Sequence, residues 1–332
     1  MLLWRHWFVK GEYWPRGTRG RDHYVAVALT GGRMLMDIST GKATLANVTA
    51  ETPEKNDKKM VREAEVVEVE WLSPGLVRIS FTGEALRDIP ELDCTDHYIK
   101  FFFPPEGAQY SWPFDPAQLR TALLPAQRPV TRTYTVRSFN RRTNVLAVDF
   151  VVHGADGLAG PWAAKAVPGD RIGFRGPGGK FVPDPSADAL LLVGDEAAVP
   201  AIAATLESLP ENVVVQVFVE VTDEHHRVEL PITEGTTIHW VHRDGHSPGV
   251  CLAEAVRNAP YPEGAVQAFV HGNAHMVKDV RRYLFVERGL DKAQASISGY
   301  WRTEYTEDAW QASKHEFVAV MEAEEAAARE QR

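Results

Sequence analysis

The chain is 332 residues long, with 44% hydrophobic residues, 24% charged residues and a formal net charge of −9. This length exceeds that of a usual single domain, so we expect two domains with substantial hydrophobic cores. The negative charge argues against general affinity for nucleic acid or acidic membranes, although it is compatible with a local basic pocket.

Cysteine usage and hydropathy indicate the compartment. Cys94 and Cys251 lie far apart and form neither a disulfide framework nor a paired metal motif, which is typical of a reducing cytosol. No apolar run reaches the roughly 18 residues that span a bilayer. Arg5, His6 and Lys10 interrupt the apolar residues at the start, which argues against a secretory signal. We therefore predict a cytoplasmic protein without stable membrane insertion.

Residues 1–60 are predicted to be an extension and a linker. The pattern over 24–39 predicts a hairpin that turns at Gly31-Gly32, and a polar linker over 49–59 follows. None of the motifs below falls in this segment, so we expect it to be dispensable for the core.

Residues 61–183 are predicted to form a first domain of short strands. Glycine and proline clusters separate the strands, and one short helical piece at 161–167 interrupts them. The pattern predicts a small closed β-barrel. The six strands are expected at 63–71, 76–81, 97–103, 132–138, 145–153 and 171–176.

Residues 187–318 are predicted to form a second domain in which strands and helices alternate. This alternation favours a parallel sheet with helices on both faces. Strands are expected at 189–194, 213–221, 237–243, 265–272 and 295–301, and helices at 199–208, 252–258 and 274–288. A final charged helix is expected to begin at Thr306, a suitable cap, and to continue into a charged tail at 319–332.

The stretch RTYTVRSF, Arg132 to Phe139, places a cation or a hydroxyl on each face of a predicted strand, where one buried face should be apolar. A flavin dinucleotide would supply the missing partners. Arg132 offers a forked donor to a phosphate, the Tyr134 ring can stack on the flavin, and Thr135 can donate to its redox-active nitrogen. Taken alone, the pattern also fits a surface strand with an Arg–Tyr cross-strand pair.

A second motif runs from Asp149 to Gly179. A strand ending in His153 is followed by a turn of small residues and a helix that opens at Pro161-Trp162. Small residues at a helix N-terminus let backbone N–H groups approach a phosphate. The alternative is an ordinary glycine-rich turn with Trp162 in the core.

Two further motifs lie in the second domain. In GDEAAVPAI a buried strand ends at Gly194 and Asp195, where α/β folds place their ligands. In SGYWRTEYTEDAW two aromatic residues end the last strand before Arg302. Taken alone, this fourth motif also fits an aromatic core edge with a surface arginine.

In this order, R-x-Y-T, V-V-H-G…W-A…P-G-D…G-P-G-G, G-D-E-x-A-x-P-A-I and S-G-Y-W-R…T-E-D-x-W resemble the siderophore-interacting protein family. Its members are FAD-containing ferric-siderophore reductases of the ferredoxin-reductase-like superfamily. The similarity covers roughly Val61 to Phe317. It implies a six-stranded antiparallel Greek-key β-barrel that binds FAD, then a parallel-sheet α/β domain like that which binds NAD(P)H in ferredoxin-NADP reductase.

The resemblance also implies roles for individual residues. Arg132, Tyr134 and Thr135 would hold the flavin pyrophosphate, ring and ring edge. Backbone groups around Asp149 and Val151 would line the pyrimidine side. The phosphates and ribose would be held by His153, Ala159, Gly160, Trp162 and Ala163. Asp195 and Trp301 would close the site from the second domain. The chain departs from the family pattern at Ala197, usually threonine, and at Asn273, usually glutamate.

The predicted function is reduction of a ferric siderophore, with release of Fe(II) in the cytoplasm. Ferric siderophores are often anionic, and Lys100, Lys180 and Arg302 are our candidates for a basic substrate pocket. The alternatives are a general NAD(P)H:flavin or electron-transfer reductase and a non-catalytic siderophore-binding flavoprotein.

The sequence leaves the electron donor open between NADH, NADPH and a ferredoxin. Glu220, Asp223 and Glu224 would suit NADH, whereas His225, His226 and Arg227 could accept an NADP phosphate. We predict no metal site. The histidine pairs 225/226 and 239/242 lack Cys or carboxylate partners at ligand spacing.

Overall fold

The computed structural model describes residues 24–29, 32–37, 43–46 and 60–331, without 106–107, 109–111, 155–156 and 211. The chain divides into two compact units, Met1–Asn56 and Asp57–Arg332. Among the described residues, no helix is both long and apolar enough to cross a membrane.

The first unit contains an antiparallel sheet of β1 (Tyr24–Leu29), β2 (Gly32–Asp37) and β3 (Ala43–Ala46). The first two strands form the predicted hairpin. The sequence predicted a turn at Gly31-Gly32. In the structure Gly32 pairs with Leu29 and is already the first residue of β2. The linking residues 30–31 lie outside the described residues.

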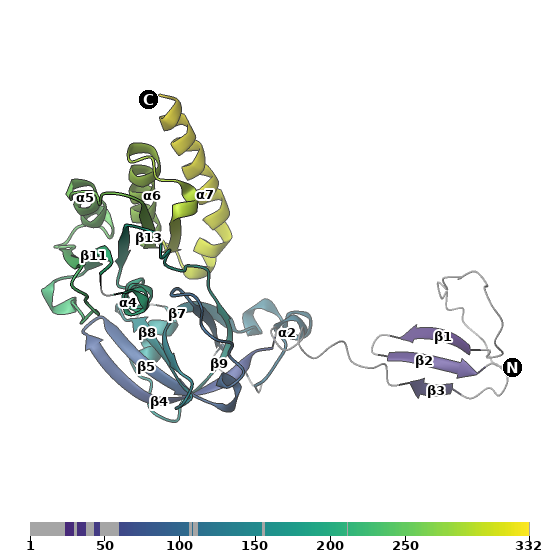
Figure 1. Ribbon diagram of the computed structural model, residues 1–332. Helices are drawn as coiled ribbons and strands as arrows, with labels where there is room; N and C mark the ends of the chain where they lie inside the picture. The colour runs from purple at the N-terminus through teal and green to yellow at the C-terminus, as the bar shows by residue number, and fades with distance from the viewer. Residues whose placement is uncertain are drawn as a thin grey trace. The chain divides into compact units, whose positions relative to one another are not determined.

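The second unit begins with a closed six-stranded barrel (Figure 1). Its strands are β4 (Arg62–Ser73), β5 (Leu76–Thr82), β6 (Tyr98–Phe103), β7 (Val130–Asn140), β8 (Val145–Val151) and β9 (Arg171–Gly178). The order around the barrel is β4-β5-β8-β7-β6-β9, and the pairs are antiparallel. Because β5 pairs with β8 and not with β6, the connection is of the Greek-key type. The predicted barrel is confirmed.

The barrel closes around an aromatic core. Phe81, Phe101, Phe150 and Phe174 are fully buried in it. The two-residue period of a strand explains how β6 serves two environments. Its residues Ile99, Phe101 and Phe103 point into the core, whereas Tyr98 and Lys100 lie on the opposite face.

The second part of this unit is a five-stranded parallel sheet in the order β12-β11-β10-β13-β14. Its strands are β10 (Ala189–Asp195), β11 (Val214–Val221), β12 (Thr236–His242), β13 (Val266–Asn273) and β14 (Ala295–Trp301). Helix α4 (Val199–Ser208) packs on one face, and α5 (Val250–Asn258) and α6 (Ala274–Arg282) pack on the other. The predicted parallel sheet with helices on both faces is therefore confirmed.

Several local features differ from the prediction or complete it. The helix predicted at 274–288 continues beyond α6 as a π-helical turn, Tyr283–Glu287. The sequence did not indicate α2 (Pro116–Ala122), and α3 is a short helix at Ala159–Ala163. The remaining short turns are Glu84–Leu86, Pro125–Gln127, Glu224–His226 and Lys292–Gln294.

Helix α7 (Glu307–Glu330) ends the described chain. It begins where the sequence predicted, because the Thr306 hydroxyl accepts a hydrogen bond from the Ala309 N–H at 3.2 Å. Trp310 and Met321 bury its inner face, and Arg281 of α6 donates to the buried carboxylate of Glu325 at 2.6 Å. The helix is therefore fixed to α6 near its C-terminal end.

Removal of residues 1–56 should leave the second unit folded, because the barrel and the sheet lie entirely within Asp57–Arg332. A chain that begins at Asp57 should unfold cooperatively at the same midpoint as the second unit of the full chain, as followed by circular dichroism. An insoluble product, or a clearly lower midpoint, would show that the first unit supports the barrel.

Candidate functional site

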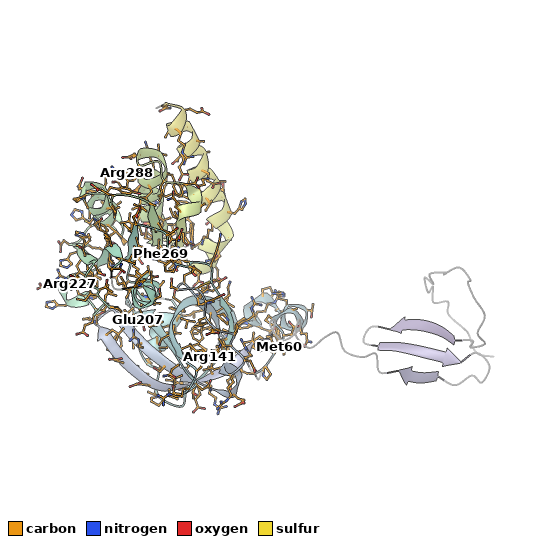
Figure 2. All side chains as sticks on the ribbon, in the orientation of Figure 1. Met60, Arg141, Glu207, Arg227, Phe269 and Arg288 are labelled. Carbon is orange, nitrogen blue, oxygen red and sulfur yellow. The ribbon has the colours of Figure 1, made fainter. Side chains whose placement is uncertain are left out.

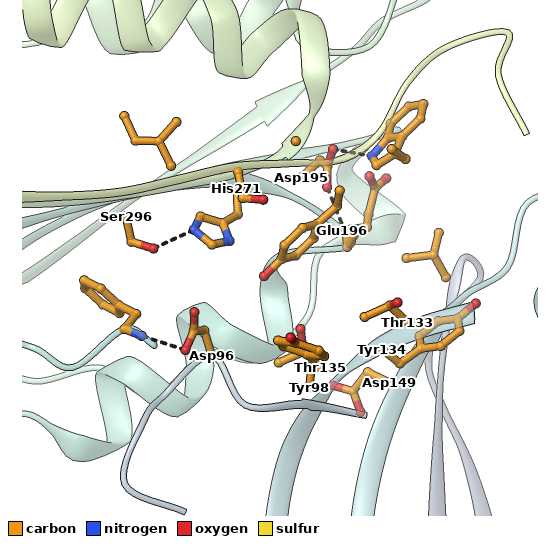
Figure 3. Close-up of a pocket in the computed structure, with 18 of the residues that line it drawn as sticks. Asp96, Tyr98, Thr133, Tyr134, Thr135, Asp149, Asp195, Glu196, His271 and Ser296 are labelled. Carbon is orange, nitrogen blue, oxygen red and sulfur yellow. Dashed lines mark hydrogen bonds between the residues drawn. The ribbon is translucent and has the colours of Figure 1, made fainter. Parts of the chain in front are cut away.

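A cavity of about 1350 Å³ lies between the barrel and the parallel sheet (Figure 3). Its lining includes Tyr98 and Thr135 from the barrel, and Asp195 and Trp301 from the carboxyl ends of β10 and β14. The volume exceeds the roughly 300–1,000 Å³ of a usual small-molecule site, so the cavity has room for more than one ligand.

The barrel wall of this cavity is polar because of the register between β6 and β7. Tyr98 pairs with Thr135, and Lys100 pairs with Thr133. Side chains directly opposite on paired strands share a face, and all four of these residues line the cavity. The polar residues that were anomalous in the sequence therefore face a cavity and not solvent alone.

Tyr134 lies on the other face of β7. Its ring centroid is 4.3 Å from that of Phe150, which holds the ring at the end of the barrel core. Burial raises the pKa of the phenol above its usual value, so the hydroxyl stays protonated and can donate a hydrogen bond at neutral pH.

A second cavity of about 140 Å³ adjoins the first and shares Tyr134, Val151 and His153 with it. Arg132 and the turn residues 157–160 complete its lining, so the structure brings the first two motifs together. The turn packs closely on β8, since a Cβ on Gly160 would lie 3.3 Å from the Val151 carbonyl oxygen.

Trp162 and Ala163 line neither cavity. The Trp162 ring stacks parallel to Phe81 at 6.4 Å and meets Phe103 edge-on at 5.8 Å, and Ala163 is fully buried. The structure places both in the barrel core behind the turn, which is the alternative environment that the sequence left open for Trp162.

Asp149 and Val151 of β8 also line the main cavity. The Asp149 carboxylate is fully buried and accepts two hydrogen bonds from the Arg78 guanidinium, at 2.7 and 2.9 Å. Both carboxylate oxygens of Asp149 are therefore bound to Arg78, and we expect any ligand to contact Asp149 through its backbone.

Asp195 connects the third motif with the fourth. Its carboxylate accepts from the Trp301 indole N–H at 2.8 Å, the Asn273 backbone N–H at 2.7 Å and the Ala197 backbone N–H at 3.0 Å. Ala197 and Asn273 are two of the positions at which the chain departs from the family pattern, and both contribute main-chain groups here. Burial, with the neighbouring Glu196 charge, raises the pKa of Asp195 to about 6.

Arg243, which the sequence analysis did not single out, holds acidic residues together on the same wall. Arg243 donates to Glu196 and, at 3.1 Å, to the buried Glu220, which also accepts from the Gly249 N–H at 2.8 Å. The Asp223 carboxylate accepts from the His225 backbone N–H at 2.9 Å and bonds His226 at 2.7 Å. Two of the three acids proposed for a dinucleotide ribose are therefore engaged within the fold.

Sequence reasoning also missed His271, which lies in the lining of the main cavity. His271 is buried there, its Nε2 lies 3.0 Å from the Ser296 hydroxyl (Figure 3), and its Nδ1 has no partner within the described residues. Burial and the nearby Lys314 lower the pKa of His271 to about 3. The imidazole is therefore neutral. The alternation of polar residues in ASISGYW was the available signal.

Of the three predicted substrate cations, Lys100 and Lys180 line the main cavity. The buried Asp96 carboxylate positions the second one, because it accepts from the Lys180 and Phe181 backbone N–H groups at 2.7 Å each. Arg302 is not in the lining; its guanidinium lies over the Tyr305 ring at 4.2 Å. Lys314, from α7, lines the cavity instead.

Asp93, Cys94 and His97 bring three potential metal ligands within 4.8 Å of one another. The His97 Nε2, however, accepts the Cys94 backbone N–H at 3.1 Å, which occupies the lone pair that a metal would need. We interpret this group as a hydrogen-bonded turn.

Known proteins are similar to this chain in sequence and in fold. Residues 65–181 match the siderophore-interacting FAD-binding domain family, and residues 187–304 match the siderophore-interacting protein family. Ferric vibriobactin reductase ViuB of Vibrio cholerae is 35% identical over 260 residues, which cover 76% of this chain and 94% of that protein.

Solved structures agree. The siderophore-interacting protein SipS from Aeromonas hydrophila has a TM-score of 0.67 at 29% identity, and the match covers 79% of this chain and 99% of that chain. The ferredoxin reductase of carbazole 1,9a-dioxygenase has a TM-score of 0.53 at 16% identity, over 73% of this chain and 70% of its own, and supports the fold alone.

A closed antiparallel barrel followed by a parallel sheet gives the chain a ferredoxin-reductase-like fold, and its barrel matches a family of FAD-binding domains. Within this class, the chain belongs to the siderophore-interacting protein family.

Asp195 should make stability depend on pH in a particular direction. A buried carboxyl whose folded pKa lies above its unfolded value of about 4 stabilises the fold while protonated, and this contribution is lost as the pH rises through the folded pKa. In urea unfolding, the free energy of unfolding of the wild type minus that of Asp195→Asn should therefore fall from about pH 4 to pH 6 and stay constant above about pH 7. Parallel curves would contradict this placement of Asp195.

Proposed function

We propose that this protein is an FAD-dependent reductase of ferric siderophores that releases Fe(II) in the cytoplasm. Electrons come from NAD(P)H or from a ferredoxin-type donor. The observation that carries the proposal is the cation, phenol and hydroxyl of Arg132, Tyr134 and Thr135 around two adjoining cavities. The family and the relative named as a ferric vibriobactin reductase support it.

The residues at these cavities suit FAD. The smaller cavity combines the Arg132 guanidinium with a turn of small residues packed on β8, which fits a pyrophosphate in its charge and its close backbone approach. In the proposed site, Arg132 and the backbone of Ala159 and Gly160 hold the phosphates, with His153 beside the ribose. Trp162 and Ala163 support this turn from the barrel core.

The larger cavity suits the flavin ring and the substrate. In the proposed site, Tyr134 packs against the ring, Thr135 donates to its edge, and backbone groups of Asp149 and Val151 meet the pyrimidine side. Asp195 holds the Trp301 indole in place to close the site from the sheet. When bound, a flavin can accept two electrons together and deliver them singly.

The remaining task of the protein is to dock the iron complex. Fe(III) is a hard ion held by hard oxygen donors, and one-electron reduction weakens that ligation. The reaction therefore needs no protein acid–base pair. Lys100, Lys180 and Lys314 supply positive charge along the cavity and would attract an anionic complex.

Arg132→Ala should weaken FAD binding, because it removes a charge-assisted contact of about 1.5–3 kcal/mol, or about 10- to 150-fold in Kd. Titration of the apoprotein with FAD, followed by flavin fluorescence, measures this. Arg142 is exposed on the β7–β8 turn, so Arg142→Ala is a control that removes the same charge and should bind FAD normally. Equal Kd values for wild type and Arg132→Ala would move the pyrophosphate away from Arg132.

Lys100→Gln together with Lys180→Gln should raise the KM for an anionic ferric siderophore several-fold, with little change in FAD content. Anaerobic assays with NADH, NADPH or a reduced ferredoxin, and a ferrous chelator as reporter, give both KM and the preferred donor. Arg302→Gln is the matched control, since Arg302 lies outside the cavity lining. Normal kinetics of the double variant, with unchanged salt dependence, would place the substrate elsewhere.

A further inference from the structure

Arg132 is already engaged by two carboxylates from the first turn of α7. The Asp308 carboxylate lies 3.3 Å from the Arg132 Nη1, and the Glu307 carboxylate lies 3.5 Å from its Nε. Glu307 also accepts the Thr133 backbone N–H at 3.3 Å, so it holds the α7 turn directly on β7.

These carboxylates stand where the proposed function requires a phosphate. The Arg132 side chain is 14% exposed, and Glu307 is also partly buried, so solvent screens their interaction less than that of an ordinary surface pair. Glu307 lines the main cavity while Arg132 lines the smaller one. A pyrophosphate at Arg132 would bring further negative charge beside Glu307 and Asp308, and all three groups would draw on the single positive charge of this guanidinium.

We propose that Glu307 and Asp308 compete with the FAD pyrophosphate for Arg132, so that FAD binding is coupled to release of the first turn of α7 from β7. This inference rests on the proposed role of Arg132 in FAD binding. Glu307 and Asp308 are thus positioning residues that hold the affinity for FAD below what the site would otherwise reach.

The rest of α7 can stay in place during this exchange. Trp310 is buried and its indole N–H donates to the Gly299 carbonyl at 3.3 Å, and Lys314 reaches the Ser298 hydroxyl at 3.1 Å. The movement is therefore confined to the residues that precede Trp310, where Glu304 already has a positive φ of 66°.

The test measures FAD affinity, not activity. Glu307→Gln keeps an acceptor for the Thr133 N–H but removes the charge. Asp308→Asn removes the charge of the exposed carboxylate. Each should lower the Kd for FAD, with Glu307→Gln on the order of three- to tenfold tighter than wild type. Glu316→Gln, an exposed carboxylate two to three turns along α7, should leave the Kd unchanged.

A double-mutant cycle separates competition for Arg132 from a general charge effect. In an Arg132→Ala background, Glu307→Gln should no longer tighten FAD binding. An unchanged or weaker affinity of Glu307→Gln in the wild-type background would overturn the inference. So would the same gain in both backgrounds.

Hydrogen exchange provides a measurement that needs no variant. Addition of FAD to the wild type should speed exchange of the Thr133 amide, which loses its carboxylate acceptor; slower or equal exchange would count against release of the turn. If Arg132→Ala leaves FAD affinity unchanged, the site proposal fails as well. If Arg132→Ala weakens binding and Glu307→Gln does not strengthen it, this inference alone fails.

Discussion

The buried carboxylate of Asp195 is the interaction on which the arrangement of the cavity depends. Three N–H donors converge on it from the turn into α4, the end of β13 and the Trp301 side chain of β14. These elements form the sheet side of the cavity, and without a common acceptor their donors would be buried unpaired. One carboxylate thus holds three separate chain segments together. The pKa of Asp195 is raised because burial makes its charged form less favourable.

The opposite wall follows from a different constraint. Strand β7 closes the barrel and also borders the main cavity, so it carries polar as well as apolar side chains. Thr133 and Thr135 face the main cavity with Tyr98 and Lys100 of β6, while Tyr134 reaches the barrel aromatics through Phe150. The polar residues that are unusual for a strand in a barrel wall are therefore the residues that line the cavity.

Much of the fold could be predicted from the sequence because short-range patterns carried it. The short run HYIKFFF at 97–103 indicated β6, and Thr306 marked the start of α7. Helix α2 was not indicated by the sequence, although Pro116 occupies its first turn and Asp115 caps it.

The site was predicted less completely, because its geometry depends on long-range packing. The R-x-Y-T strand and the turn at 157–160 line one cavity, and the sequence had assigned both to the same ligand from their residue types. His271, Lys314 and Arg243 enter the cavity from separate elements, and no local pattern links them. Arg302 shows the converse: it directly follows Trp301 in sequence, yet it turns away to lie on Tyr305.

The packing of the barrel against the sheet has a mechanical consequence. Leu76 and Phe181, from the barrel side, are buried in the same hydrophobic cluster as Leu190 and Ile202 of the α/β part. Arg137 of β7 adds a bidentate ion pair to Glu207 of α4, at 2.6 and 2.8 Å. Figure 2 shows Glu207 on α4, beside the barrel. A shared core of this kind resists hinge bending, because opening it would expose apolar surface on both parts. The barrel and the sheet are therefore held together as one stiff frame, so any rearrangement around the cavity falls to loops and side chains.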